Sequence, residues 1–230
     1  MLPRFVLLSF VFLLGTPAFA QEQHCVNPPE VVVTGADAET FAEICTSAEK
    51  AVAFLGRYYF RPQSPISIEI VQGKISTGGF DVYGNFDGKA DRIQLMSYSA
   101  VFATADDPKV FGEPFDRVHY SGIIAHEVAH AVVEHYFRRK KFSGTPQEYL
   151  AYVTQLATLP DERRNAIIKA MDVGPWEGGD DISTIYLAMS PGKFAVKSYL
   201  HLMSLKHPQE FIKILLETNW IYIHVPRDLS

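Results

Sequence analysis

The stretch Ile123-Ile124-Ala125-His126-Glu127-Val128-Ala129-His130-Ala131-Val132-Val133 sets two histidines and a glutamate within a run of apolar residues. Such an apolar run predicts a buried helix. Residues four apart on a helix share one face, so His126 and His130 can bind a single Zn²⁺. Burying these ionisable side chains without partners would be costly, and a metal ion removes that cost. The stretch therefore predicts a zinc-binding helix at the centre of the fold.

Glu127 follows the first histidine directly. In that position its carboxylate can accept a proton from a water that the metal activates, so we expect Glu127 to be the catalytic general base. Two other hypotheses stay open at this point. One is an exported zinc-binding protein without peptidase activity that docks a partner, and the other is a metal-free helical binding module.

The composition favours one globular domain and excludes some partners. The chain has 230 residues, of which 47% are hydrophobic and 20% charged, and this length can bury a large core. Its formal net charge of −5 gives no basic surface for nucleic acid. The local basic run Arg138–Lys141 is expected at the exposed end of the central helix, where cations are favoured.

The first twenty residues have the pattern of a signal peptide. Arg4 precedes the apolar run from Phe5 to Leu14, and Ala18-Phe19-Ala20 forms a cleavage motif. The apolar run is too short to span a bilayer, so no stable membrane insertion is expected after cleavage. We therefore predict residues 1–20 as a signal peptide and an exported mature protein, periplasmic or secreted. Its oligomeric state is not indicated.

The chain contains two cysteines, Cys25 and Cys45. An even pair in an oxidising compartment favours a disulfide bond, which would join the mature N-terminus to the first helix. Neither cysteine lies near the histidine motif in sequence, so neither is expected to bind the metal.

Hydrophobic periodicity predicts strands mixed with helices first and helices alone afterwards. The fold class is therefore α+β, with a small mixed or antiparallel sheet followed by the active helix and a C-terminal helical lobe. Residues 21–230 form one domain, in which 21–115 supply the sheet part and 116–230 the active helix and helical part. The expected strands are Glu30–Thr34, Ile66–Val71 and Arg92–Met96, the last in a hairpin with Phe80–Tyr83 around a turn at 84–88. The expected helices are Ala38–Tyr59, Arg117–Arg139, Pro146–Leu159, Asp161–Met171, Asp181–Met189, Gly192–Leu205 and Gln209–Thr218, with Asp37 and Asp116 as N-caps of the first two.

A catalytic zinc site needs a third protein ligand. A histidine six residues after His130 is excluded because Tyr136 stands there. Glu148 lies one turn into the next predicted helix and is the preferred ligand, although Thr145-Pro146-Gln147-Glu148 is also a capping box. Glu134, Asp161 and Glu162 are poorer alternatives.

These residues resemble the gluzincin branch of zinc metallopeptidases in a compact form, through His126-Glu127-Val128-Ala129-His130 and Glu148 in an E-x-x-A sequence. The resemblance implies a zincin-like fold that binds zinc through His126, His130 and Glu148 and acts on a peptide or protein substrate. It also implies that a strand before the active helix pairs with the substrate backbone, and Arg92–Met96 is the expected counterpart. Tyr152 stands where many gluzincins place an aspartate that orients a histidine.

The reaction would also need a hydrogen-bond donor for the tetrahedral oxyanion. Tyr186, Tyr199 and His201 come late enough in the chain to be weak candidates. The histidines His119, His207 and His224 are expected to be ordinary surface or capping residues.

Overall fold

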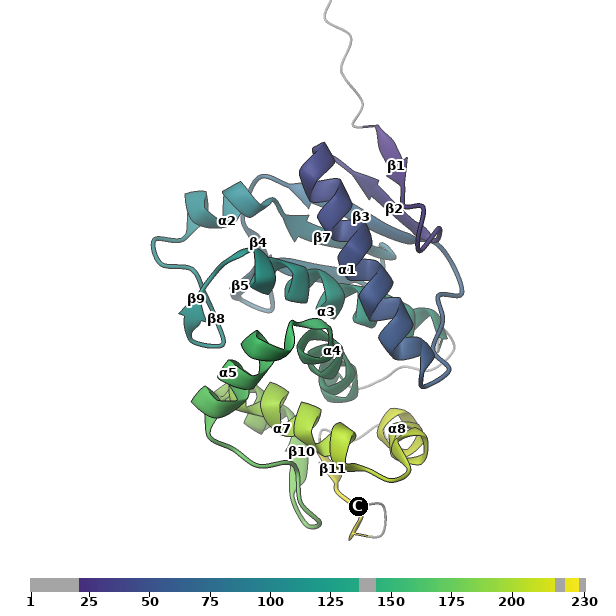
Figure 1. Cartoon of the computed structure of the whole chain (residues 1–230), viewed down its shortest axis with the longest axis vertical. Coiled ribbons are helices and arrows are strands. Elements are labelled where there is room, and N and C mark those ends of the chain that lie inside the picture. The colour runs from purple at the N-terminus through teal and green to yellow at the C-terminus, as the bar shows by residue number, and fades with distance from the viewer. Residues whose placement is uncertain (1–20, 137–143, 218–221, 228–230) are drawn as a thin grey trace, which may run out of the picture.

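The computed structural model describes residues 21–136, 144–217 and 222–227, and it runs from a sheet-containing half into a helical half (Figure 1). The first half contains β1 (Glu22–His24), β2 (Val31–Thr34), α1 (Ala38–Gly56), β3 (Ile66–Val71), β4 (Ile75–Thr77), β5 (Phe80–Val82), β6 (Gly84–Asp87), β7 (Arg92–Met96), α2 (Tyr98–Thr104), β8 (Lys109–Val110) and β9 (Glu113–Pro114). The second contains α3 (Arg117–Tyr136), α4 (Gly144–Thr158), α5 (Asp161–Met171), β10 (Asp181–Ser183), α6 (Thr184–Met189), α7 (Pro191–Ser204), α8 (Pro208–Glu217) and β11 (Tyr222–His224). The predicted α+β class is confirmed.

The main sheet has five strands in the order β1-β2-β3-β7-β6. The pairs β2–β3 and β3–β7 are parallel, whereas β1–β2 and β6–β7 are antiparallel. Parallel neighbours need a crossover connection, and α1 provides it between β2 and β3. The sheet is therefore mixed, which is one of the two arrangements that the sequence analysis allowed.

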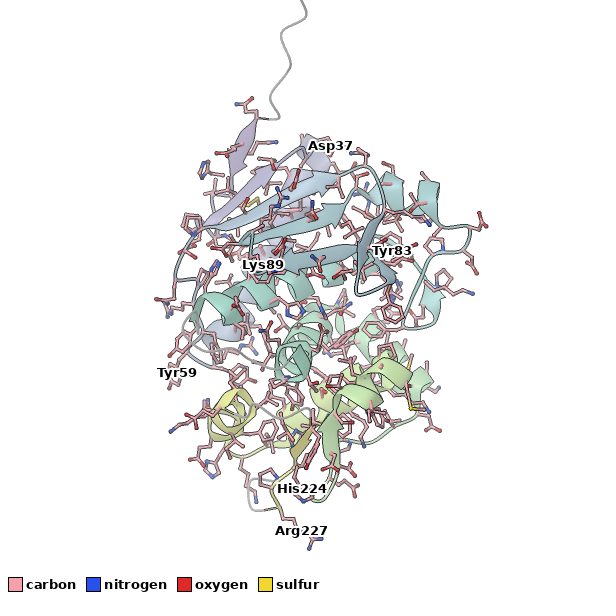
Figure 2. All side chains as sticks on the ribbon, turned by 180° about the vertical axis from the view of Figure 1, so that it is seen from behind. Asp37, Tyr59, Tyr83, Lys89, His224 and Arg227 are labelled. Atoms are coloured by element: carbon pink, nitrogen blue, oxygen red, sulfur yellow. A yellow bond between two sulfur atoms is a disulfide. The ribbon has the colours of Figure 1, made fainter. Side chains whose placement is uncertain are left out.

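One face of this sheet is buried by helices. In β3 the alternate residues Ile66, Ile68 and Ile70 are buried, as the alternating pattern of the sequence predicted. Helices α1 and α3 pack on that face (Figure 1). Figure 2, seen from behind, shows the opposite face of the sheet with no helix across it. The core therefore lies between the sheet and α3.

Helix α3 separates the sheet from the helical half and contacts both (Figure 1). Its N-terminus is capped by Asp116, whose Oδ1 accepts a hydrogen bond from the His119 backbone N–H at 2.9 Å, as predicted. Most of its side chains are buried, because apolar residues surround the helix on nearly every side. The predicted extension to Arg139 and the basic run Arg138–Lys141 lie outside the described residues, as does the predicted signal peptide.

The predicted hairpin before α3 is placed wrongly. The segment expected to be its turn forms strand β6 instead, and β6 pairs with β7. The turn comes later, where the Asp87 carboxylate accepts hydrogen bonds from the backbone N–H groups of Lys89 (2.8 Å) and Ala90 (3.1 Å). As a result, Arg92–Met96 lies inside the sheet between β3 and β6, and β6 is the edge strand.

The helical half differs from the sequence prediction mainly at Asp181–Met189. That segment was expected to be one helix, but Asp181–Ser183 forms strand β10 and pairs with β11. Helix α6 begins only afterwards, where the Ser183 hydroxyl accepts a hydrogen bond from the Tyr186 backbone N–H at 3.2 Å. The partner strand lies about forty residues further along the chain, beyond the reach of a local pattern.

The N-terminal segment of the described chain is tied to α1. Cys25 and Cys45 form the predicted disulfide, with a Cα–Cα distance of 5.5 Å. Asp37 caps α1, as predicted, because its carboxylate accepts a hydrogen bond from the Thr40 backbone N–H at 2.8 Å. Among the described helices, none combines the length and the apolar character needed to cross a bilayer.

Replacing Cys25 and Cys45 together by alanine should lower the free energy of unfolding by about 3 kcal/mol, because the bond restricts the unfolded chain. The two cysteines are 20 positions apart, so the closed loop is short. Chemical denaturation under non-reducing conditions measures the effect. Unchanged stability of the double variant would show that the bond does not constrain the unfolded chain.

Candidate metal centre

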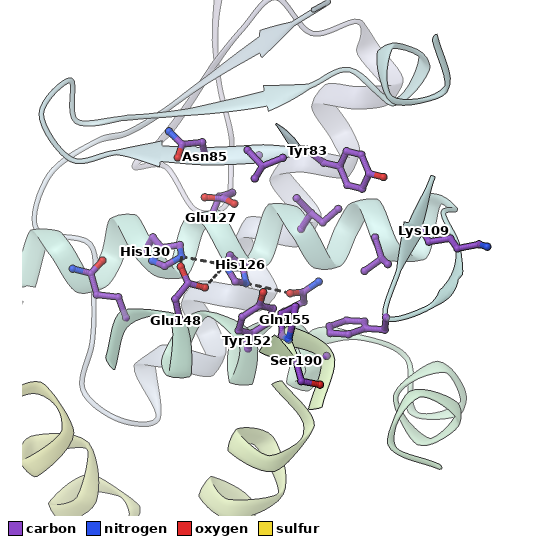
Figure 3. Close-up of a pocket in the computed structure, with 18 of the residues that line it drawn as sticks. Tyr83, Asn85, Lys109, His126, Glu127, His130, Glu148, Tyr152, Gln155 and Ser190 are labelled. Atoms are coloured by element: carbon purple, nitrogen blue, oxygen red, sulfur yellow. Dashed lines mark hydrogen bonds and ion pairs between the residues drawn. The ribbon is translucent and has the colours of Figure 1, made fainter. Parts of the chain in front are cut away.

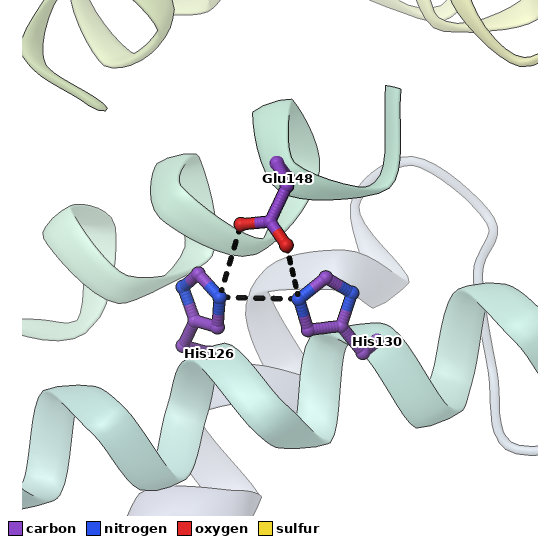
Figure 4. Close-up of side chains that lie close together, drawn as sticks. All are labelled: His126, His130 and Glu148. Carbon is purple, nitrogen blue, oxygen red and sulfur yellow. Dashed lines mark hydrogen bonds and ion pairs between the residues drawn. The ribbon is translucent and has the colours of Figure 1, made fainter. Parts of the chain in front are cut away.

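Three side chains with metal-binding atoms meet where α3 contacts α4 (Figure 4). His126 and His130 lie one turn apart on α3, with their Nε2 atoms 3.1 Å from each other. Glu148 on α4 places Oε2 3.5 Å from the Nε2 of His126 and Oε1 3.4 Å from the Nε2 of His130. The donor atoms all lie within 4.8 Å of one another. The structure thus brings together the three residues that were selected as ligands from the sequence.

The local structure of α4 explains why Glu148 faces the histidines. The sequence left open a capping box in which Thr145 would cap the helix and Glu148 would bond back to it. Instead, α4 already includes Thr145, whose Oγ1 hydrogen-bonds with Thr184 Oγ1 at 2.6 Å. The Glu148 carboxylate is therefore directed at α3 and bridges the two rings.

The spacing of these donors suits a tetrahedral metal ion. When a metal lies about 2.1 Å from each donor in tetrahedral geometry, neighbouring donors are about 3.4 Å apart. The three closest separations in the cluster are 3.1, 3.4 and 3.5 Å. Two imidazoles and one carboxylate are also a donor set that zinc accepts, and they leave a fourth position open.

A further residue of α4, Gln155, orients His126. Its Oε1 lies 3.1 Å from the His126 Nδ1, and the side chain of Gln155 is buried. An amide oxygen can only accept, so Nδ1 carries the hydrogen and the Nε2 lone pair faces the other ligands. Sequence reasoning missed Gln155, although it lies seven residues after Glu148 and thus on the same face of α4.

Tyr152 lies between Glu148 and Gln155 on that face. Its ring packs edge-on against the His126 ring, with centroids 4.6 Å apart. Burial raises the pKa of Tyr152, and the carboxylates of Glu148 and Glu127 raise it further, so its hydroxyl keeps its proton. Tyr152 therefore supplies a packing contact to His126, and Gln155 makes the hydrogen bond that orients the His126 ring.

The charges in the cluster are arranged to hold a cation. Burial opposes the charged form of His130, but the adjacent Glu148 carboxylate outweighs it and raises the pKa of His130 to about 9. Burial also opposes the charge on Glu148, yet the two imidazoles hold its pKa well below the ordinary value. The carboxylate thus stays ionised and attracts positive charge, whether a proton or a metal ion.

Glu127 lies on the other side of α3, between that helix and β6 (Figure 3). Its side chain is buried, and Oε2 accepts a hydrogen bond from the Phe86 backbone N–H at 2.9 Å. Burial raises the pKa of Glu127, against the opposite effect of His126 and His130. A raised pKa makes this carboxylate a stronger base than an ordinary glutamate, as a proton acceptor needs to be.

Gly84 on β6 makes room for this carboxylate. A Cβ atom at position 84 would lie 2.8 Å from Glu127 Cγ and 3.1 Å from Glu127 Oε1. A glycine is therefore required for the strand to approach the helix this closely. Gly84 was expected to lie in a turn, and its role in the site was not predicted from the sequence.

The side chains of His126, His130, Glu148 and Glu127 all line one cleft of about 790 Å³ (Figure 3). Its floor is α3, and its walls come from β6, the β8–β9 hairpin, α4 and the segment where α6 meets α7. The cleft is large enough to hold a segment of peptide or a small molecule.

The other candidates from the sequence lie elsewhere. Tyr186, Tyr199 and His201, which were weak candidates for the oxyanion donor, do not line the described cleft. His201 is buried in the helical half and hydrogen-bonds the Tyr149 hydroxyl at 2.8 Å. The alternative ligands are also outside the cluster: Glu134 accepts a hydrogen bond from Gln147, Asp161 pairs with Arg164, and Glu162 is exposed.

The expectation that His119 is a surface or capping residue is wrong. Its side chain is fully buried, and its ring nitrogens lie 3.2 Å from an Asp116 carboxylate oxygen and 3.5 Å from one of Glu113. His224, by contrast, is exposed and lies 3.1 Å from Asp181, as expected for a surface residue. His119 is buried because the β8–β9 hairpin folds over the start of α3, a contact that local sequence does not reveal.

Fold and site together define an α+β protein with a three-donor candidate metal centre between its central helix and the next. The chain belongs to a family of unknown function, DUF6639, whose family model matches residues 31–225. The matched segment contains every residue of the candidate metal centre. No curated protein and no solved structure matches the chain.

Gly84→Ala should lower the free energy of unfolding by about 1–3 kcal/mol, because the added methyl group overlaps with Glu127. Urea denaturation measures this. Gly88→Ala in the following turn is the matched control, since a Cβ there has its nearest contact at an ordinary 3.8 Å. Equal stability of the two variants would contradict the close approach of β6 to Glu127.

The zinc affinity of the metal-free protein should rise with pH until about pH 9, by up to about tenfold per unit, because His130 must lose a proton to bind. Since the pKa of His130 is raised above 6.5, its pairing with Glu148 stabilises the metal-free fold below pH 6.5 and is lost as pH rises through about 9. Calorimetric titration in two buffers of different ionisation enthalpy counts the released protons. Zinc affinity that is constant between neutral pH and pH 9 would contradict the pairing.

Proposed function

We propose that this protein is an exported zinc-dependent peptidase that hydrolyses peptide bonds, with His126, His130 and Glu148 as zinc ligands and Glu127 as general base. The observation that carries the proposal is the placement of three donors at tetrahedral spacing in the same cleft as a buried carboxylate. A protein that only binds zinc does not require the buried Glu127 carboxylate, whereas hydrolysis requires it as a proton acceptor.

A zinc ion bound by the three ligands would act as a Lewis acid that polarises the substrate carbonyl and lowers the pKa of the attacking water. Glu127 then accepts the proton of that water and delivers it to the leaving amine. Its hydrogen bond to the Phe86 N–H holds one oxygen in place. The other oxygen, Oε1, lies beside Gly84.

Strand β6 is suited to hold the substrate backbone. The Phe86 N–H points away from β7 toward Glu127, and alternate residues of a strand direct their backbone groups to the same side. The N–H and C=O of Gly84 therefore also face the free edge. In this proposal the extended substrate pairs with β6, and the interior strand Arg92–Met96 has no such role.

Tyr152 is the residue that we propose as donor to the tetrahedral oxyanion. It lines the cleft beside His126, and Figure 3 shows its side chain on the α4 side of the metal centre. Its raised pKa keeps the hydroxyl protonated, as a hydrogen-bond donor must be. It replaces the three residues of the helical half that were suggested by sequence alone.

The exported location is supported by the disulfide. Cys25 and Cys45 are bonded, and disulfides persist mainly in oxidising compartments. The signal-peptide pattern of residues 1–20 points the same way. The proposal is therefore a periplasmic or secreted enzyme that acts on peptides or proteins.

Glu127→Gln should keep zinc and lower peptide hydrolysis by at least about 100-fold, because the amide cannot accept the proton. His126→Ala should lose both zinc and activity. Glu162→Gln is the matched control, since Glu162 is exposed on α5 outside the cleft, and it should behave like the wild type. Metal analysis and assays with a broad peptide library provide the two readouts.

Undiminished hydrolysis by Glu127→Gln would overturn its role as general base. Zinc bound by the wild type without hydrolysis of any library peptide would favour the partner-docking hypothesis instead. Absence of zinc together with unchanged folding of His126→Ala would favour the metal-free module.

A further inference from the structure

The β8–β9 hairpin carries a bulky residue in a conformation that suits small ones. The hairpin turn consists of Phe111 and Gly112, with φ values of 55° and 79°. Two consecutive positive φ values are typical of the tight hairpin turn in which asparagine and glycine predominate. An aromatic residue with positive φ is a conformational outlier. Local turn preference therefore does not explain why a phenylalanine stands there, and such outliers cluster at functional sites.

The Phe111 ring forms part of the cleft wall near Tyr152. It lines the cleft and lies 6.5 Å, between ring centroids, from Tyr152, whose own ring packs on His126. A Cβ built on Gly192, at the start of α7, would lie 3.1 Å from the Met171 Sδ of α5 and 3.7 Å from the Phe111 ring. The hairpin tip, α5 and α7 thus meet beside the metal centre and form this end of the cleft wall.

A cluster of charged residues fixes the hairpin in this position. Glu113 on β9 lies 3.2 Å from Arg163 of α5 and 3.5 Å from the buried His119 of α3. Arg163 also binds Asp116 at 2.7 Å. Phe111 is therefore carried by an anchored hairpin, so its ring is a fixed wall of the cleft.

This end of the cleft is mainly apolar. Its lining includes Val110, Phe111, Ile123, Tyr152 and Met171, with Gln155 and Ser190 as polar side chains. Met189 also lines the cleft but is 82% exposed. Apart from the three candidate metal ligands and Glu127, the charged residues among the described lining are Lys109 and Lys193, which are exposed. A basic side chain entering this end would be repelled by the two lysines, and any charged group would lose hydration there without an opposite charge among the residues of this end. A large apolar side chain gains from burial instead.

We propose that Phe111 is a specificity-determining residue. Its ring forms the end wall of an apolar subsite beside His126, and this subsite receives a bulky aliphatic or aromatic side chain of the substrate residue next to the scissile bond. The inference rests on the proposed peptidase function and adds to it the class of peptide that is cleaved.

The test compares peptides that differ only in the residue next to the cleaved bond, with leucine, phenylalanine, alanine, lysine or glutamate at that position. The wild type should prefer leucine and phenylalanine over alanine by at least about tenfold in kcat/KM, as expected when a hydrophobic pocket loses methylene groups. Phe111→Asn should abolish most of this preference. Asparagine fits the turn well, so the variant should keep its melting temperature within a few degrees, whereas a purely structural role predicts a clear loss.

A second readout does not depend on turnover. In the Glu127→Gln background, the uncleaved leucine and alanine peptides should bind with different affinities, and Phe111→Asn should remove the difference. Phe80→Asn is the matched control, because Phe80 on β5 is 74% exposed and is not part of the cleft lining. If Phe111→Asn does not fold, Met171→Ala, which alters the same wall, carries the test.

Unchanged discrimination in the folded variants would overturn the inference while leaving the peptidase proposal intact. So would a preference of the wild type for lysine or glutamate. Failure of the wild type to cleave any peptide in a zinc-dependent way would instead reject the proposed function on which the subsite rests.

Discussion

The packing of α4 on α3 is the contact on which the site depends, because it brings a carboxylate between two imidazoles. His126 and His130 come from one helix and need no tertiary structure to be neighbours. Glu148 reaches them only because α4 lies across that helix, and it bridges both rings at 3.4 and 3.5 Å. Three polar groups at such spacing in a largely apolar contact favour a cation among them. The Gln155 contact adds to this by fixing the ring orientation of His126.

The main sheet contacts α3 on the side where Glu127 lies. Strand β6 brings the Phe86 N–H to Glu127, and Gly84 lets the strand approach closely enough for that hydrogen bond. The general base proposed here is thus held by the sheet, whereas the ligands are held by α4. Helix α3 presents both sets of groups to one cleft, which explains why it lies between the two halves of the fold (Figure 1).

Sequence reasoning succeeded where a local pattern determines the structure. The periodic apolar residues around His126 and His130 predicted α3. The helix-breaking pair Ser143-Gly144 indicated that the next helix, with Glu148, could fold back against it. It failed where a partner lies far away in sequence. The segment around Gly84 resembles a turn in sequence, but it forms the edge strand β6. Strand β10 was predicted as helix because its partner β11 is distant in sequence. The burial of His119 depends on the β8–β9 hairpin, which packs over it. Gln155 could have been found from its helical spacing to Glu148.

Anomalous X-ray diffraction at the zinc absorption edge, on crystals of the protein, tests the central claim most directly. The account predicts one strong peak among the side chains of His126, His130 and Glu148, at about 2.0–2.2 Å from a ligand atom of each. It would be contradicted by an empty position between the three side chains in the presence of excess zinc. A zinc peak bound by Asp161 or Glu162 in place of Glu148 would contradict it equally.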